Sequence, residues 1–367
     1  MILGASGEVG ALAQPIAPGN GSLFGPRGAA TDTSGTGPLV VADTGHHRLM
    51  IWHQVPETDQ APADCLIGQP DFESEGRNGK GPAGAATLNV PTGVAISGNH
   101  LAVADAWNHR VLIWHEIPSR LNQPADLVLG QRDFASVEAN RGGEAGADTL
   151  NWCYGVAFLG DWLVVSDTGN RRVLVWHNMP QQNGQPADLV LGQRSFTCRD
   201  ESAGADAGPL GMRWPHSVAQ IGSMILVSDA GNNRIMAWED MPAEPGAPCN
   251  FVLGQQDLKS LEHNAGDYWP DAFSLNMPYS IAAVGGWLIA ADTANSRLVG
   301  WDHDQLRQGG QATGLAGQHD FTQKGDNRWH FARRDSMCWP YGLAECGDAL
   351  VIADSGNNRV VIWGFAP

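Results

Sequence analysis

The sequence has no apolar run long enough to cross a membrane. Its longest apolar stretches, such as WLVVSD at 162–167 and LVIADSG at 350–356, are far shorter than the roughly 20 residues that a spanning helix needs. The first ten residues, MILGASGEVG, are too short and too rich in glycine for a signal peptide. We therefore expect no membrane contact, and either a cytoplasmic protein or the processed form of a secreted one.

Paired cysteine motifs and clustered bases are also missing. The six cysteines, at positions 65, 153, 198, 249, 338 and 346, have no CxxC spacing, which predicts reduced, partly buried thiols. Lysine and arginine number 22 against 39 acids, which gives a formal charge of −17, and no run of bases stands out. Because nucleic acid is bound largely through such bases, the charge argues against a nucleic-acid partner.

What the sequence does have is one motif in six copies. Each copy has an aspartate, an asparagine or histidine three residues later, an arginine two residues after that, and a tryptophan that ends the next apolar run. The aspartates stand at positions 43, 105, 167, 229, 292 and 354, so they are spaced by 62 or 63 residues. Such regular spacing indicates six equivalent structural units.

One unit contains four short strand patterns. Between 89 and 134 these are NVPTGVAIS, HLAVADA, HRVLIWHEIP and DLVLGQRDF, each rich in aliphatic residues and bounded by Gly, Pro, Asn or Asp. Four antiparallel strands per repeat build one blade of a β-propeller. The predicted fold class is therefore all-β, a six-bladed β-propeller.

The fourth strand of the last unit is missing, because the chain stops after VVIWGFAP. The N-terminal MILGASGEV has the same Leu-Gly step as the internal fourth strands, so we expect it to complete the last blade and close the ring. The predicted single domain then has its outer strand of blade six at 1–9, its first five blades at 23–72, 88–134, 150–196, 212–258 and 275–321, and the inner three strands of blade six at 337–365.

The chain resembles the NHL-repeat β-propellers. NHRVLIW at 108–114 is close to the motif that names the family, and NRRVLVW, NNRIMAW, NSRLVGW and NNRVVIW repeat it. The GQxDF strands with their glycine-rich connectors look like those of bacterial members. The resemblance implies the fold but not one function, since members include RNA binders, protein-binding sensor domains and related lyases.

The repeated residues are interpreted as structural. We expect each aspartate to end a second strand, each arginine to clamp a carboxylate and backbone carbonyls, and each tryptophan to pack between blades. Residues that are identical in every blade do not single out one site, so function is expected where the blades differ. The long connectors after the GQxDF strands differ most, and they lie on one face with the turns between second and third strands.

One repeat position also varies, at the start of each inner strand. Around the ring it is occupied by Arg27, Thr92, Tyr154, His216, Tyr279 and Tyr341. We predict that these residues, except the threonine, bind a ligand together with three neighbouring tryptophans. The predicted ligand-binding set is Arg27, Tyr154, His216, Tyr279, Tyr341, Trp152, Trp214 and Trp339. We expect them at the mouth of the central channel, where they would bind an anionic or aromatic ligand or a peptide turn. The alternative is a plug that fills the channel together with water.

A resident cofactor is not expected. The related peptidyl-amidoglycolate lyases hold zinc with three histidines on alternate blades, but here the alternate partners of His216 are Thr92 and Tyr341. Gluconolactonase-like propellers bind a divalent cation at the channel mouth, where this chain offers no acid and has Glu345 only further along one strand. A structural cation held by backbone carbonyls in the channel is compatible with the sequence.

The sequence therefore predicts a non-catalytic interaction module that binds a protein, a peptide or a small ligand at the channel mouth and on the connectors. No nucleophile motif, phosphate loop or dinucleotide fingerprint is present. The alternative is a lyase-type or hydrolase-type enzyme at the same mouth, with His216 as base and Arg27 as oxyanion partner. The oligomeric state stays open.

Overall fold

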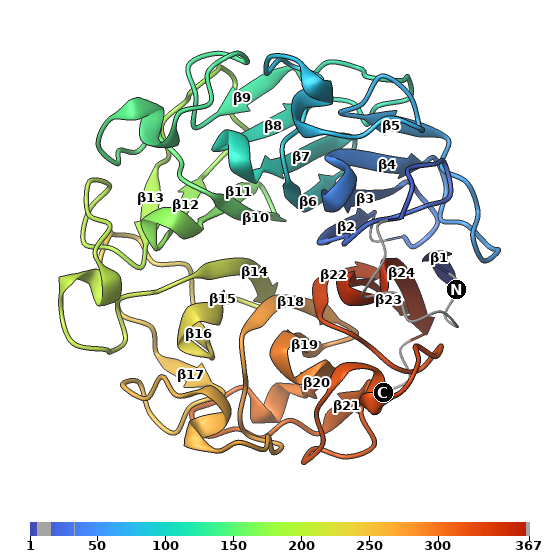
Figure 1. The fold of residues 1–367 in the computed structure, drawn as a ribbon. Coiled ribbons are helices and arrows are strands. Elements are labelled where there is room, and N and C mark those ends of the chain that lie inside the picture. Colours follow the sequence, from blue (N-terminus) through green and yellow to red (C-terminus); the bar gives the residue numbers. More distant parts are fainter. Residues whose placement is uncertain (6–15, 33, 365–367) are drawn as a thin grey trace.

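The computed structural model describes residues 1–5, 16–32 and 34–364. Within these ranges the strands form six separate four-stranded antiparallel sheets, which stand as blades around a central axis (Figure 1). No α-helix occurs in the described part of the chain, and none of its helical turns is long and apolar enough to cross a membrane. The predicted all-β, six-bladed propeller is confirmed.

Each blade is numbered from its inner strand outward. Blade one contains β2 (Gly28–Thr31), β3 (Leu39–Asp43), β4 (Arg48–Trp52) and β5 (Cys65–Ile67). Blade two contains β6 (Pro91–Ser97), β7 (His100–Asp105), β8 (Arg110–Trp114) and β9 (Leu127–Leu129). Blade three contains β10 (Cys153–Leu159), β11 (Trp162–Asp167), β12 (Arg172–Trp176) and β13 (Leu189–Leu191).

The second half of the ring repeats this order. Blade four contains β14 (Pro215–Ile221), β15 (Met224–Asp229), β16 (Arg234–Trp238) and β17 (Phe251–Leu253). Blade five contains β18 (Pro278–Val284), β19 (Trp287–Asp292), β20 (Arg297–Trp301) and β21 (Gly314–Ala316). Blade six contains β22 (Pro340–Cys346), β23 (Ala349–Asp354), β24 (Arg359–Gly364) and β1 (Ile2–Gly4).

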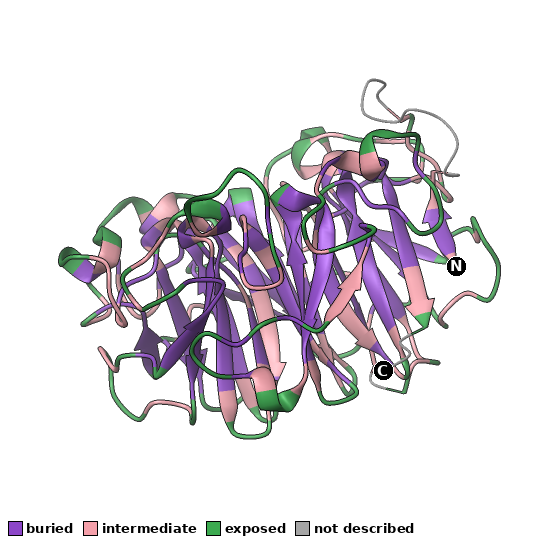
Figure 2. Cartoon of the chain, turned by 90° about the horizontal axis from the view of Figure 1, so that it is seen from below, coloured by how far each residue is buried: buried purple, intermediate pink, exposed green. Residues whose placement is uncertain are grey.

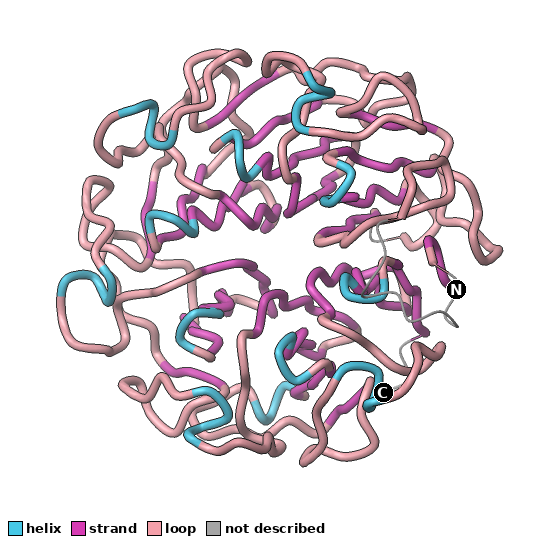
Figure 3. The backbone as a smooth tube through the Cα atoms, in the orientation of Figure 1, coloured by secondary structure: helices cyan, strands magenta, loops and turns pink. Residues whose placement is uncertain are grey.

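Short 3-10 turns join the strands (Figure 3). Those between second and third strands are η2 (Thr44–His46), η4 (Ala106–Asn108), η6 (Thr168–Asn170), η8 (Ala230–Asn232), η10 (Thr293–Asn295) and η13 (Ser355–Asn357). Those in the inter-blade connectors are η3 (Arg77–Lys80), η5 (Ala139–Gly142), η7 (Glu201–Gly204), η9 (His263–Gly266) and η12 (Asp326–Trp329), while η11 (His303–Gln305) follows β20. We call the side with both sets the connector face, and the side with the turns between first and second strands the hairpin face.

The N-terminal strand closes the ring, as predicted. β1 pairs antiparallel with β24, and Ile2 and Leu3 stand opposite Val361 and Val360 (Figure 1). The backbone N–H of Ile362 also donates to the carbonyl oxygen of Met1 at 2.9 Å. Residues 6–9 of the predicted strand, and residue 365 of the predicted last blade, lie outside the described residues.

The apolar core lies between the blades. Each of six clusters of buried side chains joins two neighbouring blades, and the side view shows the buried layer with exposed loops at both ends of the strands (Figure 2). Trp176 of blade three packs in one cluster with Leu127 and Leu129 of blade two. Its indole N–H donates to the carbonyl oxygen of Gln185 at 3.0 Å. The predicted inter-blade packing of the repeated tryptophans is confirmed for this interface.

The repeated aspartate and arginine form a buried ion pair in every blade. In blade four, Asp229 and Arg234 are 0% and 1% exposed, and the arginine Nε lies 3.0 Å from the aspartate Oδ2. The same oxygen accepts from the side-chain amide of Asn232 at 2.7 Å, and Oδ1 accepts from the backbone N–H of Arg213 at 2.8 Å. The carboxylate is thus fully hydrogen-bonded, which offsets the cost of burying it.

The guanidinium ties the connectors to the blade. Nη2 of Arg234 donates to the carbonyl oxygens of Gly208 at 3.1 Å and Gly211 at 2.8 Å, in the connector that enters the blade. Nη1 donates to the carbonyl oxygen of Leu258 at 2.9 Å, in the segment that leaves it. The motif is therefore a structural joint that holds the connector face in place.

The closure of the ring by β1 can be tested with a matched pair of substitutions. Leu3 of β1 and Leu129 of β9 occupy equivalent positions in their blades, and both are 0% exposed. Leu3→Ala and Leu129→Ala should each lower the free energy of unfolding by about 2–5 kcal/mol in urea titrations. A loss below about 0.5 kcal/mol for Leu3→Ala, beside a full loss for Leu129→Ala, would contradict the closure.

The buried ion pair predicts a large loss of protein stability when its aspartate is removed. Asp229→Ala leaves the buried guanidinium of Arg234 without its carboxylate, so unfolding should become easier by about 3–5 kcal/mol. Asp240→Ala, at an exposed position just after the same third strand, is the control and should stay within about 0.5 kcal/mol of the wild type. Chemical denaturation of the three proteins measures both effects, and equal stability would show that the pair is not a structural joint.

Candidate functional site

A backbone irregularity sets the side chains of the variable position apart from the sheets. In four blades the pairing of the inner strand skips one residue, and the skipped residues are Tyr154, His216, Tyr279 and Tyr341. A β-bulge of this kind re-aims a side chain that the ladder would otherwise hold in the sheet plane. The sequence shows which residues vary, and the bulge explains why they turn toward the axis.

These side chains meet in one aromatic cluster. The rings of Tyr279 and Tyr341 are stacked, with centroids 4.3 Å apart and planes at 14°. His216 lies 4.5 Å from Tyr279 and 5.1 Å from Tyr154 between ring centroids. The guanidinium carbon of Arg27 sits 4.8 Å from the Tyr341 centroid. We call these five residues the channel cluster, and the structure brings them together as predicted from their shared repeat position.

Burial decides the protonation of the cluster. Desolvation lowers the pKa of His216 to about 4, and Arg27 adds a smaller repulsion. The same desolvation raises the pKa of Tyr341 and of Tyr279 above the usual range of tyrosine. Because a carbonyl can only accept, the 3.0 Å contact of His216 Nδ1 with the Trp214 carbonyl oxygen means that Nδ1 carries the proton. At neutral pH the imidazole is therefore neutral and a weak base.

The channel cluster leaves little room around itself. The cavity that it lines has a volume of about 70 Å³. Pockets for drug-sized ligands usually measure roughly 300–1,000 Å³. The arrangement therefore corresponds to the plug alternative, and ligand binding at this mouth stays a prediction. A larger cavity, of about 490 Å³, continues along the axis past Ala29, Val94 and Val156.

The three predicted tryptophans do not join the cluster. Trp152, Trp214 and Trp339 are 50%, 39% and 51% exposed. Each stands just before an inner strand, so its side chain lies on the connector face. The backbone N–H of Trp152 donates to Nδ1 of His109 in the preceding blade at 2.9 Å, which anchors this position.

Other exposed aromatic residues stand on the same face. They are Trp107 in η4, Tyr268 and Trp269 in the connector before blade five, and Trp329 and Phe331 in the connector before blade six. None belongs to the predicted site set. Their position in the sequence could have identified them, because each of these aromatic residues occurs in a turn or connector, where no neighbouring strand covers its side chain.

Metal-binding geometry is not apparent in the described residues. They contain no group of three or more His, Cys, Asp or Glu side chains placed to hold an ion. Cys153 and Cys338, which flank the variable position in opposite blades, are buried, and burial raises the pKa of both thiols. Such thiols are protonated and unreactive at neutral pH.

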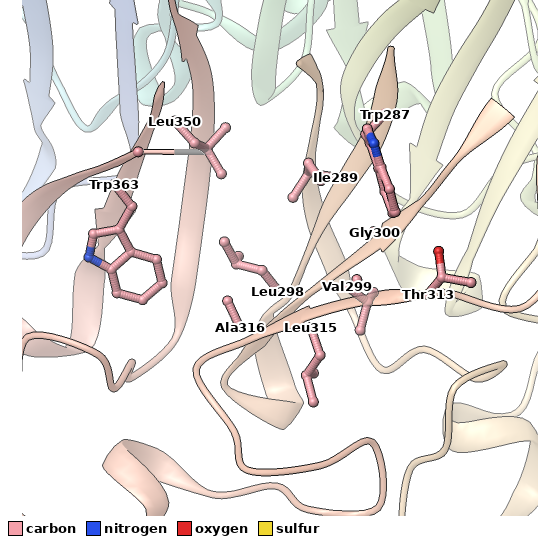
Figure 4. Close-up of a pocket in the computed structure, with 12 residues that line it drawn as sticks. Trp287, Ile289, Leu298, Val299, Gly300, Thr313, Leu315, Ala316, Leu350 and Trp363 are labelled. Carbon is pink, nitrogen blue, oxygen red and sulfur yellow. The ribbon is translucent and has the colours of Figure 1, made fainter. Parts of the chain in front are cut away.

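A separate apolar pocket of about 340 Å³ lies between blades five and six (Figure 4). Trp287 and Trp363 stand at two sides of it. The pocket exists because Gly300 and Gly314 of blade five occupy positions where blade two has isoleucine and leucine. Its side-chain hydroxyl, on Thr313, is already hydrogen-bonded to a carboxylate. Besides this hydroxyl, the polar side-chain groups of the pocket wall are the indole N–H groups of Trp287 and Trp363.

Comparisons with known proteins agree with the fold. Residues 88–114 match the family model described as the NHL repeat. The chain is similar to hydrazine synthase from Kuenenia stuttgartiensis, at 11% identity and TM-score 0.53, over 96% of this chain and 98% of that one. It is also similar to a structural genomics protein of unknown function from Bacteroides thetaiotaomicron, at 13% identity and TM-score 0.55, over 98% of this chain and 75% of that one. No curated protein matches the sequence. At such identities the likeness shows the fold alone.

The buried histidine predicts a pH-dependent stability. The pKa of His216 is about 4 in the folded state against 6.5 as its ordinary value, so the unfolded chain binds the extra proton first as the pH falls. Between about pH 6.5 and 4 this one group should remove roughly 3 kcal/mol of stability, and above that range it should have no effect. Denaturant titrations at several pH values measure the slope. His216→Gln should flatten it, whereas His303→Gln, at an exposed position, should leave it unchanged.

Proposed function

The chain is an NHL-repeat β-propeller, and we propose that it is a non-catalytic interaction module that binds a protein or peptide partner on its connector face. One observation carries the proposal. Among the described residues, nine large apolar side chains are exposed, and eight of these belong to turns and connectors of this face. The ninth is Leu121, in the loop between the third and fourth strands of blade two. Aromatic side chains gathered on one surface are typical of binding sites.

We call four exposed side chains from two neighbouring connectors the aromatic patch: Tyr268, Trp269, Trp329 and Phe331. Lys324 links these connectors, because its Nζ lies 3.5 Å from the Tyr268 ring centroid and 5.5 Å from that of Trp269. The ammonium also donates to the carbonyl oxygen of Tyr268 at 2.5 Å. A cation held against aromatic faces keeps the two connectors in one arrangement.

The patch rests on the buried joints below it. Nη2 of Arg297 donates to the carbonyl oxygens of Asp271 and Ser274, each at 3.0 Å, in the connector that carries Tyr268 and Trp269. Nη2 of Arg359 holds the next connector in the same way, through its carbonyl oxygens at 2.8 Å. Loops that are already ordered lose less conformational entropy when a partner binds.

The predicted site residues have two different roles in this proposal. Trp152, Trp214 and Trp339 extend the binding surface around the channel mouth, while the channel cluster supports it from below. An enzyme at the mouth is not favoured, because the pKa of His216 is about 4 and Arg27 lies against Tyr341. Binding of this kind needs no cofactor. We expect the module in the cytoplasm, because all six cysteines are free and five of them are buried.

A double substitution tests the proposed surface. Trp269 and Phe331 are 49% and 71% exposed, so Trp269→Ser with Phe331→Ser should fold as the wild type does. It should weaken binding of the partner by about 2 kcal/mol or more, which is roughly thirtyfold. The partner is first identified by cross-linking and pull-down from native lysate, and its affinity is then measured by titration with each purified variant.

The matched control removes an exposed apolar side chain elsewhere. Leu121→Ser, at 51% exposure, should bind the partner as tightly as the wild type. If the double variant also retains full affinity, the partner does not bind on the aromatic patch and the proposal fails.

A further inference from the structure

Blade one departs from the other blades in the turn between its second and third strands. The turn position that carries His46 in blade one carries asparagine in every other blade, as Asn108, Asn170, Asn232, Asn295 and Asn357. The His46 side chain is 0% exposed and contacts the buried ion pair of Asp43 and Arg48. Histidine titrates near neutral pH, whereas the amide that it replaces has no charge to change.

In most of the other blades this asparagine ties the turn to the connector that enters the blade. The side-chain amide of Asn108 donates to Oδ2 of Asp105 at 2.7 Å and to Oδ1 of Asn78 at 2.8 Å. Asn78 stands 30 residues earlier, in the connector between blades one and two. The same link occurs in blades three, five and six, from Asn170, Asn295 and Asn357. A link between two neutral amides is independent of pH.

His46 makes the equivalent link with its two ring nitrogens. Nδ1 lies 2.8 Å from Oδ2 of Asp43, and Nε2 lies 2.7 Å from the backbone carbonyl oxygen of Ile16, which also stands 30 residues earlier. A carboxylate and a carbonyl oxygen can only accept hydrogen bonds, so both ring nitrogens carry a proton. The imidazole is therefore a buried cation, unlike the neutral amides of the other blades.

The groups that face the imidazole favour its charged form. Burial opposes the charge of His46, but the hydrogen bond to Asp43 and the charge of that carboxylate raise its pKa above the ordinary value of 6.5. The half-exposed Glu75 carboxylate, in the connector that leaves blade one, lies 3.8 Å from Nε2 and adds a weaker attraction. The Arg48 guanidinium, on β4, opposes the charge. His47 is neutral at neutral pH, because burial lowers its pKa.

Loss of one proton removes one of the two donors of His46. The proton on Nδ1 is held more tightly, because its acceptor is a charged carboxylate. The proton on Nε2 therefore leaves first, and the lone pair of Nε2 then faces the carbonyl oxygen of Ile16. Within residues 1–5, 16–32 and 34–364, Ile16 has no other hydrogen bond.

We propose that His46 is a proton-dependent anchor for the connector that leads from the ring-closing strand β1 into blade one. The charged side chain fixes Ile16 to the turn η2, and loss of the Nε2 proton at alkaline pH releases Ile16. Nη2 of Arg48 holds the same connector further along, at the carbonyl oxygens of Gly19 and Ser22, in both states. The release is therefore local, and it gives blade one a pH-sensitive part of the connector face.

The protonation state of His46 tests the anchor directly in the wild-type, full-length protein. In proton–nitrogen NMR spectra of the histidine rings, assigned through the backbone, both nitrogens of His46 should carry a proton below pH 6.5. One proton should be lost as the pH rises, with a midpoint above 6.5. A midpoint at or below that value, or a single protonated nitrogen at acidic pH, would overturn the proposal.

Hydrogen exchange of the wild type, followed by mass spectrometry, measures the release itself. After correction for the intrinsic exchange rate, protection of residues 16–24 should fall at least about threefold between about pH 6 and about pH 9. The equivalent connector at residues 78–88, which Asn108 anchors, is the internal control and should change by less than about 1.5-fold. His216 does not disturb this range, because it titrates at about pH 4.

One variant installs the residue of the other blades. His46→Asn should remove the pH dependence of exchange at residues 16–24, because an amide does not titrate in this range. His303→Asn, at a side chain that is 75% exposed, should respond to pH as the wild type does. The same pH response in His46→Asn and the wild type, or an equal loss of protection in both connectors of the wild type, would contradict the anchor. The wild-type measurements decide the proposal even if His46→Asn does not fold.

Discussion

The buried pair of aspartate and arginine is the interaction on which the rest of the structure depends. Two charges are removed from water in every blade, and this is stable because each pair is closely hydrogen-bonded. The exception is Nη1 of Arg359 in blade six, which is buried without a partner within the described part of the chain. The arginine also donates hydrogen bonds to backbone carbonyl oxygens of the connector that enters its blade. The long connectors therefore have defined positions although they contain hardly any regular secondary structure.

On this uniform frame the blades differ at the start of their inner strands. At the connector end, the bulged residues turn toward the axis and meet in the channel cluster, which narrows the channel to a cavity of about 70 Å³. Nearer the hairpin face, the inner strands of all six blades line a wider cavity of about 490 Å³. The channel cluster therefore lies between the exposed aromatic residues of the connector face and this cavity.

The ring is also uneven where it closes. Blade six takes its outer strand from the N-terminus, so the joint between the chain ends depends on the apolar contacts of Leu3 and on three paired residues. Its neighbour, blade five, has glycine at two positions that are filled in blade two, which opens the apolar pocket beside Trp363. An apolar cavity thus lies at the interface of these two blades.

The sequence by itself determined the number of blades, the order of the strands, the closing strand and the structural joint, because each follows from a motif repeated at one spacing. It also identified Arg27, Tyr154, His216, Tyr279 and Tyr341 as one variable position. Only the tertiary structure decided that a bulge aims four of these side chains inward, that their rings meet in one cluster, and that His216 is held neutral. It alone decided which aromatic residues stay exposed. The physical reason is that spacing along the chain defines each strand, whereas contact, burial and protonation depend on side chains that other blades bring to the axis.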